Sequence, residues 1–86
     1  MHLTVTSEGP GRARITIMDN PGTARLAGTR ELHQGRAGLD VALRNAGRSF
    51  LREYGYVTRG QWAVANGAWT VAVEPDRVAE RAENGG

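Results

Sequence analysis

The sequence predicts an α+β fold in which one antiparallel sheet, made of two β-hairpins, carries a single long helix on one face. Two alternating apolar and polar segments, residues 2–7 and 12–18, predict the first hairpin. A helical period follows over residues 36–54, and a second pair of alternating segments flanks residues 66–67. The expected order is therefore ββαββ, and two layers bury the apolar faces of the helix and the sheet most economically.

The first hairpin follows from the faces that its apolar residues share. Leu3 and Val5 lie on one face of the first strand, and Ile15 and Ile17 lie on one face of the second. These faces coincide only if paired residue numbers add to an even sum, which requires a loop of an odd number of residues. The turn residues over 8–12 supply such a loop.

Residues 19–35 carry weaker signals. Residues 19–22 read Asp-Asn-Pro-Gly, which is typical of a turn. Leu26 and Leu32 are the only large apolar residues over 23–35, and two glycines in this segment disfavour a helix. We expect residues 23–35 to form a loop, with a helical turn near residues 30–34.

The helix over residues 36–54 is amphipathic. Gly47 lies at the edge of its apolar arc, where the missing side chain lets the helix approach a sheet closely. Gly55 suits the position just past the helix end, with Tyr56 packed against Leu51. The apolar side chains fall within an arc of roughly 80°, at Leu39, Leu43, Ala46, Phe50 and Tyr54.

The second hairpin has the strongest local signal, because Asn66-Gly67 between alternating segments predicts a two-residue turn of the mirror type. This register places the large side chains of both strands on one face. The expected pairs are Ala65 with Ala68, Val64 with Trp69, and Trp62 with Val71. The expected core is Leu3, Val5, Ile15, Ile17, Leu39, Leu43, Phe50, Tyr54, Trp62, Val64, Trp69, Val71 and Val73.

Length and composition limit the classes of function. The 86 residues suffice for one domain, expected over residues 1–75, followed by an acidic tail over 76–86 that is partly helical or disordered. Cysteine is absent and only two histidines are present, so we expect no disulfide, metal or cofactor site. Nothing resembles a signal peptide or the ~20 apolar residues of a membrane span. We therefore expect a cytoplasmic protein without a membrane partner.

All eleven basic residues are arginine, and there is no lysine. We expect that choice of residue to follow from codon usage in a GC-rich bacterial genome, which does not explain the positions of the arginines. Arg44, Arg48 and Arg52 are spaced four apart on the predicted helix, at about 0°, 40° and 80° around its axis, and so face away from the apolar arc. Such a stripe can lie along a phosphate backbone, be an ordinary solvated face, or bind an acidic protein.

Three further arginines, Arg12, Arg14 and Arg59, are candidates to support the stripe, because residues 1–73 carry a net charge of +4. Trp62 and Trp69 can stack on bases but share their face with valines, which favours the core. The opposite sheet face would carry small Thr and Ala side chains, which suit either solvent or a flat contact with a second copy.

Catalytic signals are weak. His33 has no neighbour at metal-ligand or nucleophile spacing, and the Gly9-Pro10-Gly11 turn lacks the features of a phosphate-binding loop. We therefore expect no enzymatic activity. The sequence favours a small binding or regulatory module that contacts nucleic-acid phosphates through helix arginines. The alternative is a protein-interaction module, an adaptor or an inhibitor. Either of these could act as a homodimer, through the Thr and Ala sheet face or through a strand edge.

Overall fold

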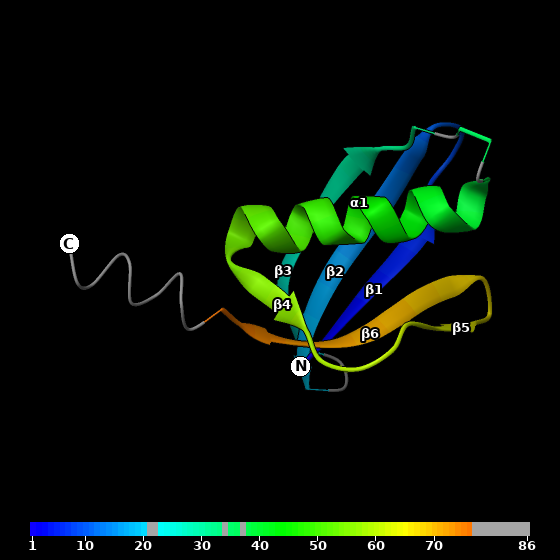
Figure 1. Cartoon of the computed structure of the whole chain (residues 1–86). Helices are drawn as coiled ribbons and strands as arrows, with labels where there is room; N and C mark the ends of the chain where they lie inside the picture. The colour runs from blue at the N-terminus through cyan, green and yellow to red at the C-terminus, as the bar shows by residue number, and fades with distance from the viewer. Residues whose placement is uncertain (21–22, 34, 37, 77–86) are drawn as a thin grey trace.

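The fold is a six-stranded antiparallel sheet with one helix on one of its faces, as a computed structural model shows for residues 1–20, 23–33, 35–36 and 38–76 (Figure 1). Three strands precede the helix and three follow it, so the expected ββαββ order is wrong, whereas the α+β class and the helix on one face are confirmed. The elements are β1 (His2–Ser7), β2 (Arg12–Asn20), β3 (Thr23–Glu31), α1 (Leu39–Tyr54), β4 (Tyr56–Thr58), β5 (Ala63–Ala65) and β6 (Ala68–Pro75).

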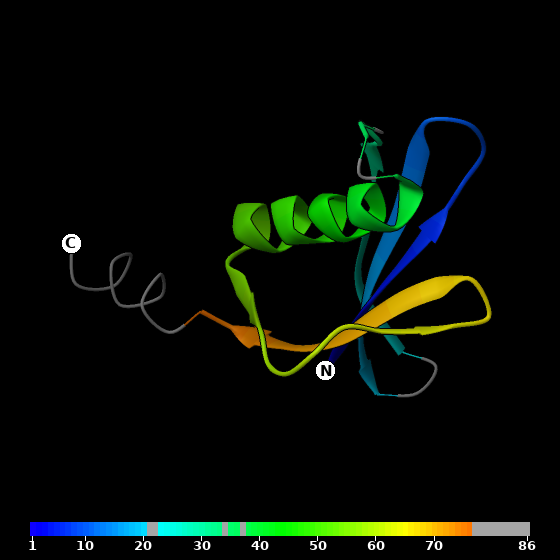
Figure 2. The ribbon, with the colours of Figure 1, turned by 45° about the vertical axis from the view of Figure 1, so that its right-hand side comes forward.

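The strands are ordered β3-β2-β1-β6-β4, and β5 also pairs with β6. The first part of β6 pairs with β5 and its last part pairs with β4, both on the side of β6 away from β1. β6 therefore joins the N-terminal hairpin to the short strands that follow the helix. Figure 2 shows α1 as a separate layer above the sheet.

Both predicted hairpins form in the predicted register. In the first, Val5 pairs with Ile15 and the paired residue numbers add to an even sum. In the second, Val64 pairs with Trp69 across a turn in which Asn66 and Gly67 both have positive φ. The expected pair of Trp62 with Val71 is wrong, because the β5–β6 ladder ends before Trp62.

The expected loop over residues 23–35 is wrong, because residues 23–31 form the edge strand β3. An edge strand is held mainly by its ladder to β2 and needs few large side chains. Gly28 also serves the packing directly, since a Cβ at this position would lie 2.9 Å from Cε2 of Phe50. The glycine that disfavours a helix therefore makes room for the helix above the strand. The expected helical turn near residues 30–34 is wrong for residues 30–31, which belong to β3, and residue 34 lies outside the described residues.

The helix begins at Leu39, three residues later than expected, directly after Gly38 with its positive φ. It ends as expected at Gly55, a left-handed residue whose N–H donates to the carbonyl oxygen of Leu51. The close approach predicted at Gly47 is confirmed. A Cβ there would lie 2.8 Å from Cη2 of Trp62 and 2.9 Å from Cγ2 of Val5.

The core lies between α1 and the β1, β2 and β6 strands, with Phe50 fully buried at its centre. Leu39 and Tyr54, the first and last residues of α1, are 40% and 46% exposed. Val64, near the tip of the last hairpin, is 56% exposed. Trp62 and Trp69 are half-buried rather than core residues. Five buried apolar residues were not on the expected core list: Ala13, Leu32, Ala42, Ala46 and Leu51.

Within the described residues, no helix is long and apolar enough to cross a membrane. The expected acidic tail over residues 76–86 lies, apart from Asp76, outside the described residues. Asp76 itself closes the end of the sheet onto the helix, because its N–H donates to the carbonyl oxygen of Gly55 over 2.8 Å.

Candidate nucleic-acid interface

The outer face of α1 carries Arg48 and Arg52, both exposed and one helical turn apart, about 6 Å along the axis. The two arginines line a shallow groove of about 410 Å³ between the last turns of α1 and the β4 strand, with Tyr56 and Thr58 on its far side. An N–H of the Arg48 guanidinium donates to the side-chain amide oxygen of Asn45 over 3.5 Å. Asp76 also lines this groove, while Asp40 and Glu53, the two carboxylates of α1, are bound to other residues.

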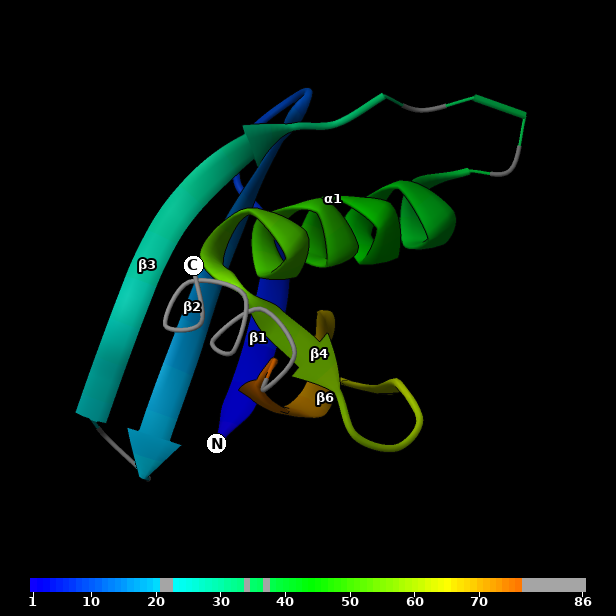
Figure 3. The same cartoon turned by 60° about the vertical axis from the view of Figure 1, so that its left-hand side comes forward.

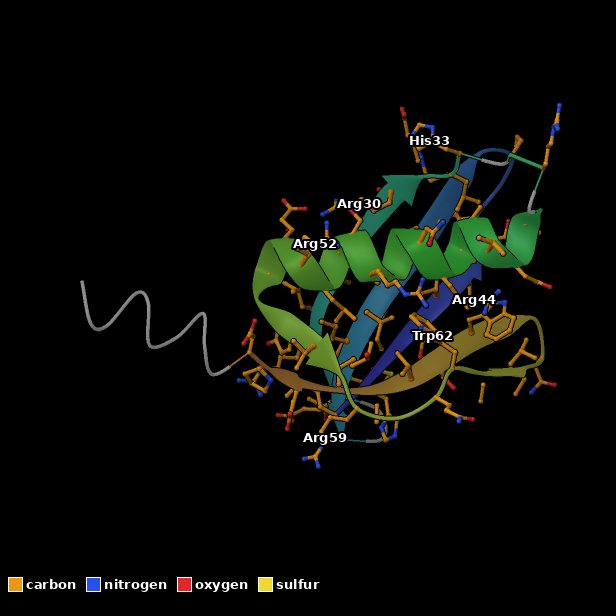
Figure 4. The ribbon with its side chains drawn as sticks, in the orientation of Figure 1. Arg30, His33, Arg44, Arg52, Arg59 and Trp62 are labelled. Carbon is orange, nitrogen blue, oxygen red and sulfur yellow. The ribbon has the colours of Figure 1, made fainter. Side chains whose placement is uncertain are left out.

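Arg44 differs from the other two arginines of the predicted stripe. Its guanidinium lies 4.7 Å from the centroid of the Trp69 ring, and its Nε–H donates to the carbonyl oxygen of Asp40 over 3.3 Å. Arg44 is therefore half-buried and does not face solvent as expected. It lies at about 110° from the centre of the buried arc of α1, which places it at the flank of the helix within reach of β6. Figure 4 shows Arg44 on the side of α1 that faces Trp62 and β6.

Both carboxylates of α1 are bound away from this surface. On one flank, Asp40 accepts a hydrogen bond of 3.2 Å from the indole N–H of Trp69. On the other flank, Glu53 forms an ion pair with Arg30 of β3, whose guanidinium lies 5.3 Å from the Phe50 ring centroid. These contacts hold the helix onto the sheet at both flanks. They also leave the positive charge of the outer face without a carboxylate partner on the helix itself.

The supporting arginines lie on the other face of the sheet. Arg12 and Arg14 are exposed and alternate along β2 with Ala13 and Ile15, which are buried under α1. Arg59 follows β4 and forms an ion pair of 3.1 Å with Glu74. Figure 4 shows Arg59 beyond β6, on the side away from α1, whereas Arg52 lies on the helix. The structure therefore divides the six predicted arginines between two surfaces.

The sequence did not predict the two contacts that hold the carboxylates of α1 away from its outer face, Trp69 with Asp40 and Arg30 with Glu53. The spacing of Asp40 and Arg44 is the usual one for an ion pair within a helix. In the structure, Arg44 instead donates to the backbone carbonyl oxygen of Asp40, because the Asp40 carboxylate accepts a hydrogen bond from Trp69. The hairpin register predicts that Trp69 shares a face with Val71. It does not predict which helix residues Trp69 contacts, because that depends on how α1 crosses the sheet.

His33 is exposed and lines a hollow of about 510 Å³ between the end of β3 and α1, together with Arg30 and Ser49. Among the residues that the structure describes, no group of three His, Cys, Asp or Glu side chains could hold a metal ion.

Comparison with known proteins finds no family model, no curated protein and no solved structure that matches this chain significantly.

Proposed function

We propose that the protein binds nucleic acid through the outer face of α1, with Arg48 and Arg52 on phosphates and Arg44 beside them. The observation that supports this proposal is the separation of charge on the helix. Asp40 and Glu53 are bound to Trp69 and Arg30, so neither neutralises the outward arginines.

The guanidinium group suits this role, because its planar fork donates two parallel hydrogen bonds to a phosphate. Arg44 adds a guanidinium whose plane is already placed by the Trp69 ring, which lowers the entropy lost when it binds. Phosphate contacts position a protein on nucleic acid without reading its sequence. We therefore expect weak discrimination between sequences and strong dependence on salt.

The second candidate is a protein-interaction module, in which the same arginines bind an acidic protein surface. The exposed groove beside Arg48 and Arg52 favours it, because an acidic side chain could enter between α1 and β4. Acidic polypeptides and nucleic acid compete for such a surface, so a direct comparison of the two ligands separates the candidates.

The test is a mobility shift with a short duplex, a single strand and polyglutamate as competitor, at low and moderate salt. We compare the full chain with R48E/R52E and with the matched control R12E/R14E, which reverses two charges on the open sheet face. We expect R48E/R52E to bind at least about 100-fold more weakly at low salt, since two phosphate contacts become repulsive. At moderate salt, where the screening length is about 10 Å, the control should stay within about threefold of the wild type.

Three results would contradict the proposal. One is an unmodified chain that does not retard nucleic acid at low salt. The second is equal binding by R48E/R52E and the wild type, which removes the helix surface from consideration. The third is tighter binding to polyglutamate than to either nucleic acid at equal charge, which favours the protein partner instead. Circular dichroism spectra of both variants check that each has folded.

A further inference from the structure

The outer edge of β3 is the longest sheet edge in the described part of the chain. β3 spans nine residues, whereas the opposite edge is divided between β4 and β5, which have three residues each. Figure 3 shows β3 outermost, alongside β2 along its whole length. Such an edge presents a row of backbone donors and acceptors that can pair with another strand.

The hydrogen bonds at the end of β3 show which backbone groups point outward. The Leu32 N–H donates to the carbonyl oxygen of Gly11 over 2.8 Å, one step past the last strand pair. Backbone groups in an antiparallel ladder point to alternate sides along the strand. The N–H and C=O groups of Ala27, Thr29 and Glu31 therefore point away from β2.

We infer that a second copy of this chain pairs with β3 in antiparallel orientation, about a two-fold axis at Gly28. In this register Ala27 faces the partner's Thr29, and their outward backbone groups bond to each other in both directions. Glu31 then faces the partner's Arg25, and the pair occurs twice. The interface is isologous, as a two-fold axis requires.

Charge selects this register over its neighbours. A shift of two residues keeps the outward backbone groups paired but places Glu31 opposite Ala27 or Thr23 of the partner, which are neutral. Opposite charges that face each other across two strands are favourable. Only the register centred on Gly28 places Glu31 opposite an arginine.

The proposed pair would extend a row of alternating charges on the open sheet face. Within one chain, Arg12 lies directly opposite Glu31 in the β2–β3 ladder. Across the interface stands the partner's Arg25, a residue that forms an ion pair of 3.2 Å with Asp19 of its own chain. The row then consists of Arg12, Glu31, the partner's Arg25 and the partner's Asp19, with charges that alternate in sign. Arg25 is exposed and has no opposite residue in the β2 ladder, because the register shifts there. Its guanidinium has five N–H donors, so it can bind Asp19 of its own chain and the partner's Glu31 together.

The helix-facing side of the interface is also compatible. Gly28 at the axis has no side chain that would meet its symmetry mate, and Phe50 covers it from above. Leu26, which is half-buried, faces the partner's Arg30. The guanidinium of Arg30 is held by Glu53 of its own chain, so its methylene groups are left to cover Leu26. This association does not depend on the nucleic-acid proposal.

The test is a charge swap on the full chain, with the mass in solution measured by sedimentation from low to high micromolar concentration. We expect the wild type to dimerise. Arg25→Glu alone and Glu31→Arg alone should each weaken the dimer by about tenfold or more, because two pairs become repulsive. The double variant R25E/E31R should dimerise within about threefold of the wild type, since both pairs are restored with reversed sign.

A second variant tests the backbone contacts. Ala27→Pro removes an N–H that points away from β2, so an edge strand tolerates it, but it blocks pairing with a second strand. We expect this variant to remain monomeric with a wild-type circular dichroism spectrum. A wild type that stays monomeric at the highest concentration overturns the inference. So does a charge-swap variant that associates no better than either single variant, which holds even if Ala27→Pro fails to fold.

Discussion

The two arginine-bearing surfaces of this protein use the same residue type in opposite ways. On the open sheet face, carboxylates accompany the arginines: Arg59 is paired with Glu74, and Arg12 lies opposite Glu31. On α1, the helix's own carboxylates, Asp40 and Glu53, are bound at the flanks by Trp69 and Arg30 and are not paired with Arg48 or Arg52. Two of the sheet arginines therefore lie beside a carboxylate, whereas the carboxylates of α1 are held away from its outward arginines by other residues.

The difference shows that the spacing of arginines is not enough to identify a binding surface. The placement of nearby carboxylates decides how much positive charge a partner meets. On α1 this placement depends on tertiary contacts, since Trp69 holds Asp40 and Arg30 holds Glu53. The helix surface should consequently be sensitive to how α1 packs, and the sheet surface should not.

The largest expected effect tests this dependence on packing. Phe50→Ala removes a fully buried ring between α1 and the β3 strand, so the free energy of unfolding should fall by about 3–5 kcal/mol. Urea unfolding followed by tryptophan fluorescence measures the change. Val64→Ala is the matched control, because Val64 is 56% exposed and its truncation should cost less than about 0.5 kcal/mol. Equal midpoints for the two variants would show that α1 is not held by this contact.

Local patterns predicted the parts of the fold that local chemistry determines. The two hairpin registers follow from alternation and from the Asn66-Gly67 turn, and the end of α1 follows from Gly55. The strand β3 was not predicted, because its ladder to β2 and the ring of Phe50 above Gly28 are tertiary contacts. They leave no periodic apolar pattern in residues 23–31.

Local patterns likewise predicted only part of the candidate site. The direction of Arg48 and Arg52 follows from helical geometry, since both lie far from the apolar arc. The contact of Arg44 with Trp69 joins residues that are 25 positions apart, and it exists because β6 passes beside the first turns of α1. Spacing along a helix cannot show which side chain of another element will cover its flank.

A smaller effect on stability tests how closely α1 approaches the sheet. Gly47→Ala places a Cβ within 3.0 Å of atoms of Trp62 and Val5, so crowding should cost about 1–3 kcal/mol. Alanine also favours the helix over glycine by about 1 kcal/mol. We expect a net loss of about 1 kcal/mol by urea unfolding. Gly35→Ala is the control, because nothing lies within 4 Å of its Cβ, and it should not lose stability. A Gly47→Ala variant that is more stable than the wild type would mean that Trp62 and β1 can shift to accommodate the added Cβ at little cost in free energy.

The smallest expected effect sharpens the comparison between the two surfaces. Asp40→Asn keeps an oxygen to accept the Trp69 N–H but removes the negative charge nearest to Arg44. At about 8 Å in water one unit charge contributes about 0.5 kcal/mol, so nucleic acid should bind about twofold more tightly at low salt. The increase should vanish at high salt, where the screening length falls to about 3 Å. Glu31→Gln is the control, because it removes the same charge from the open sheet face and should leave binding to α1 unchanged. If both variants raise the affinity equally, the protein responds to net charge alone, and the distinction between its two arginine surfaces has no consequence for binding.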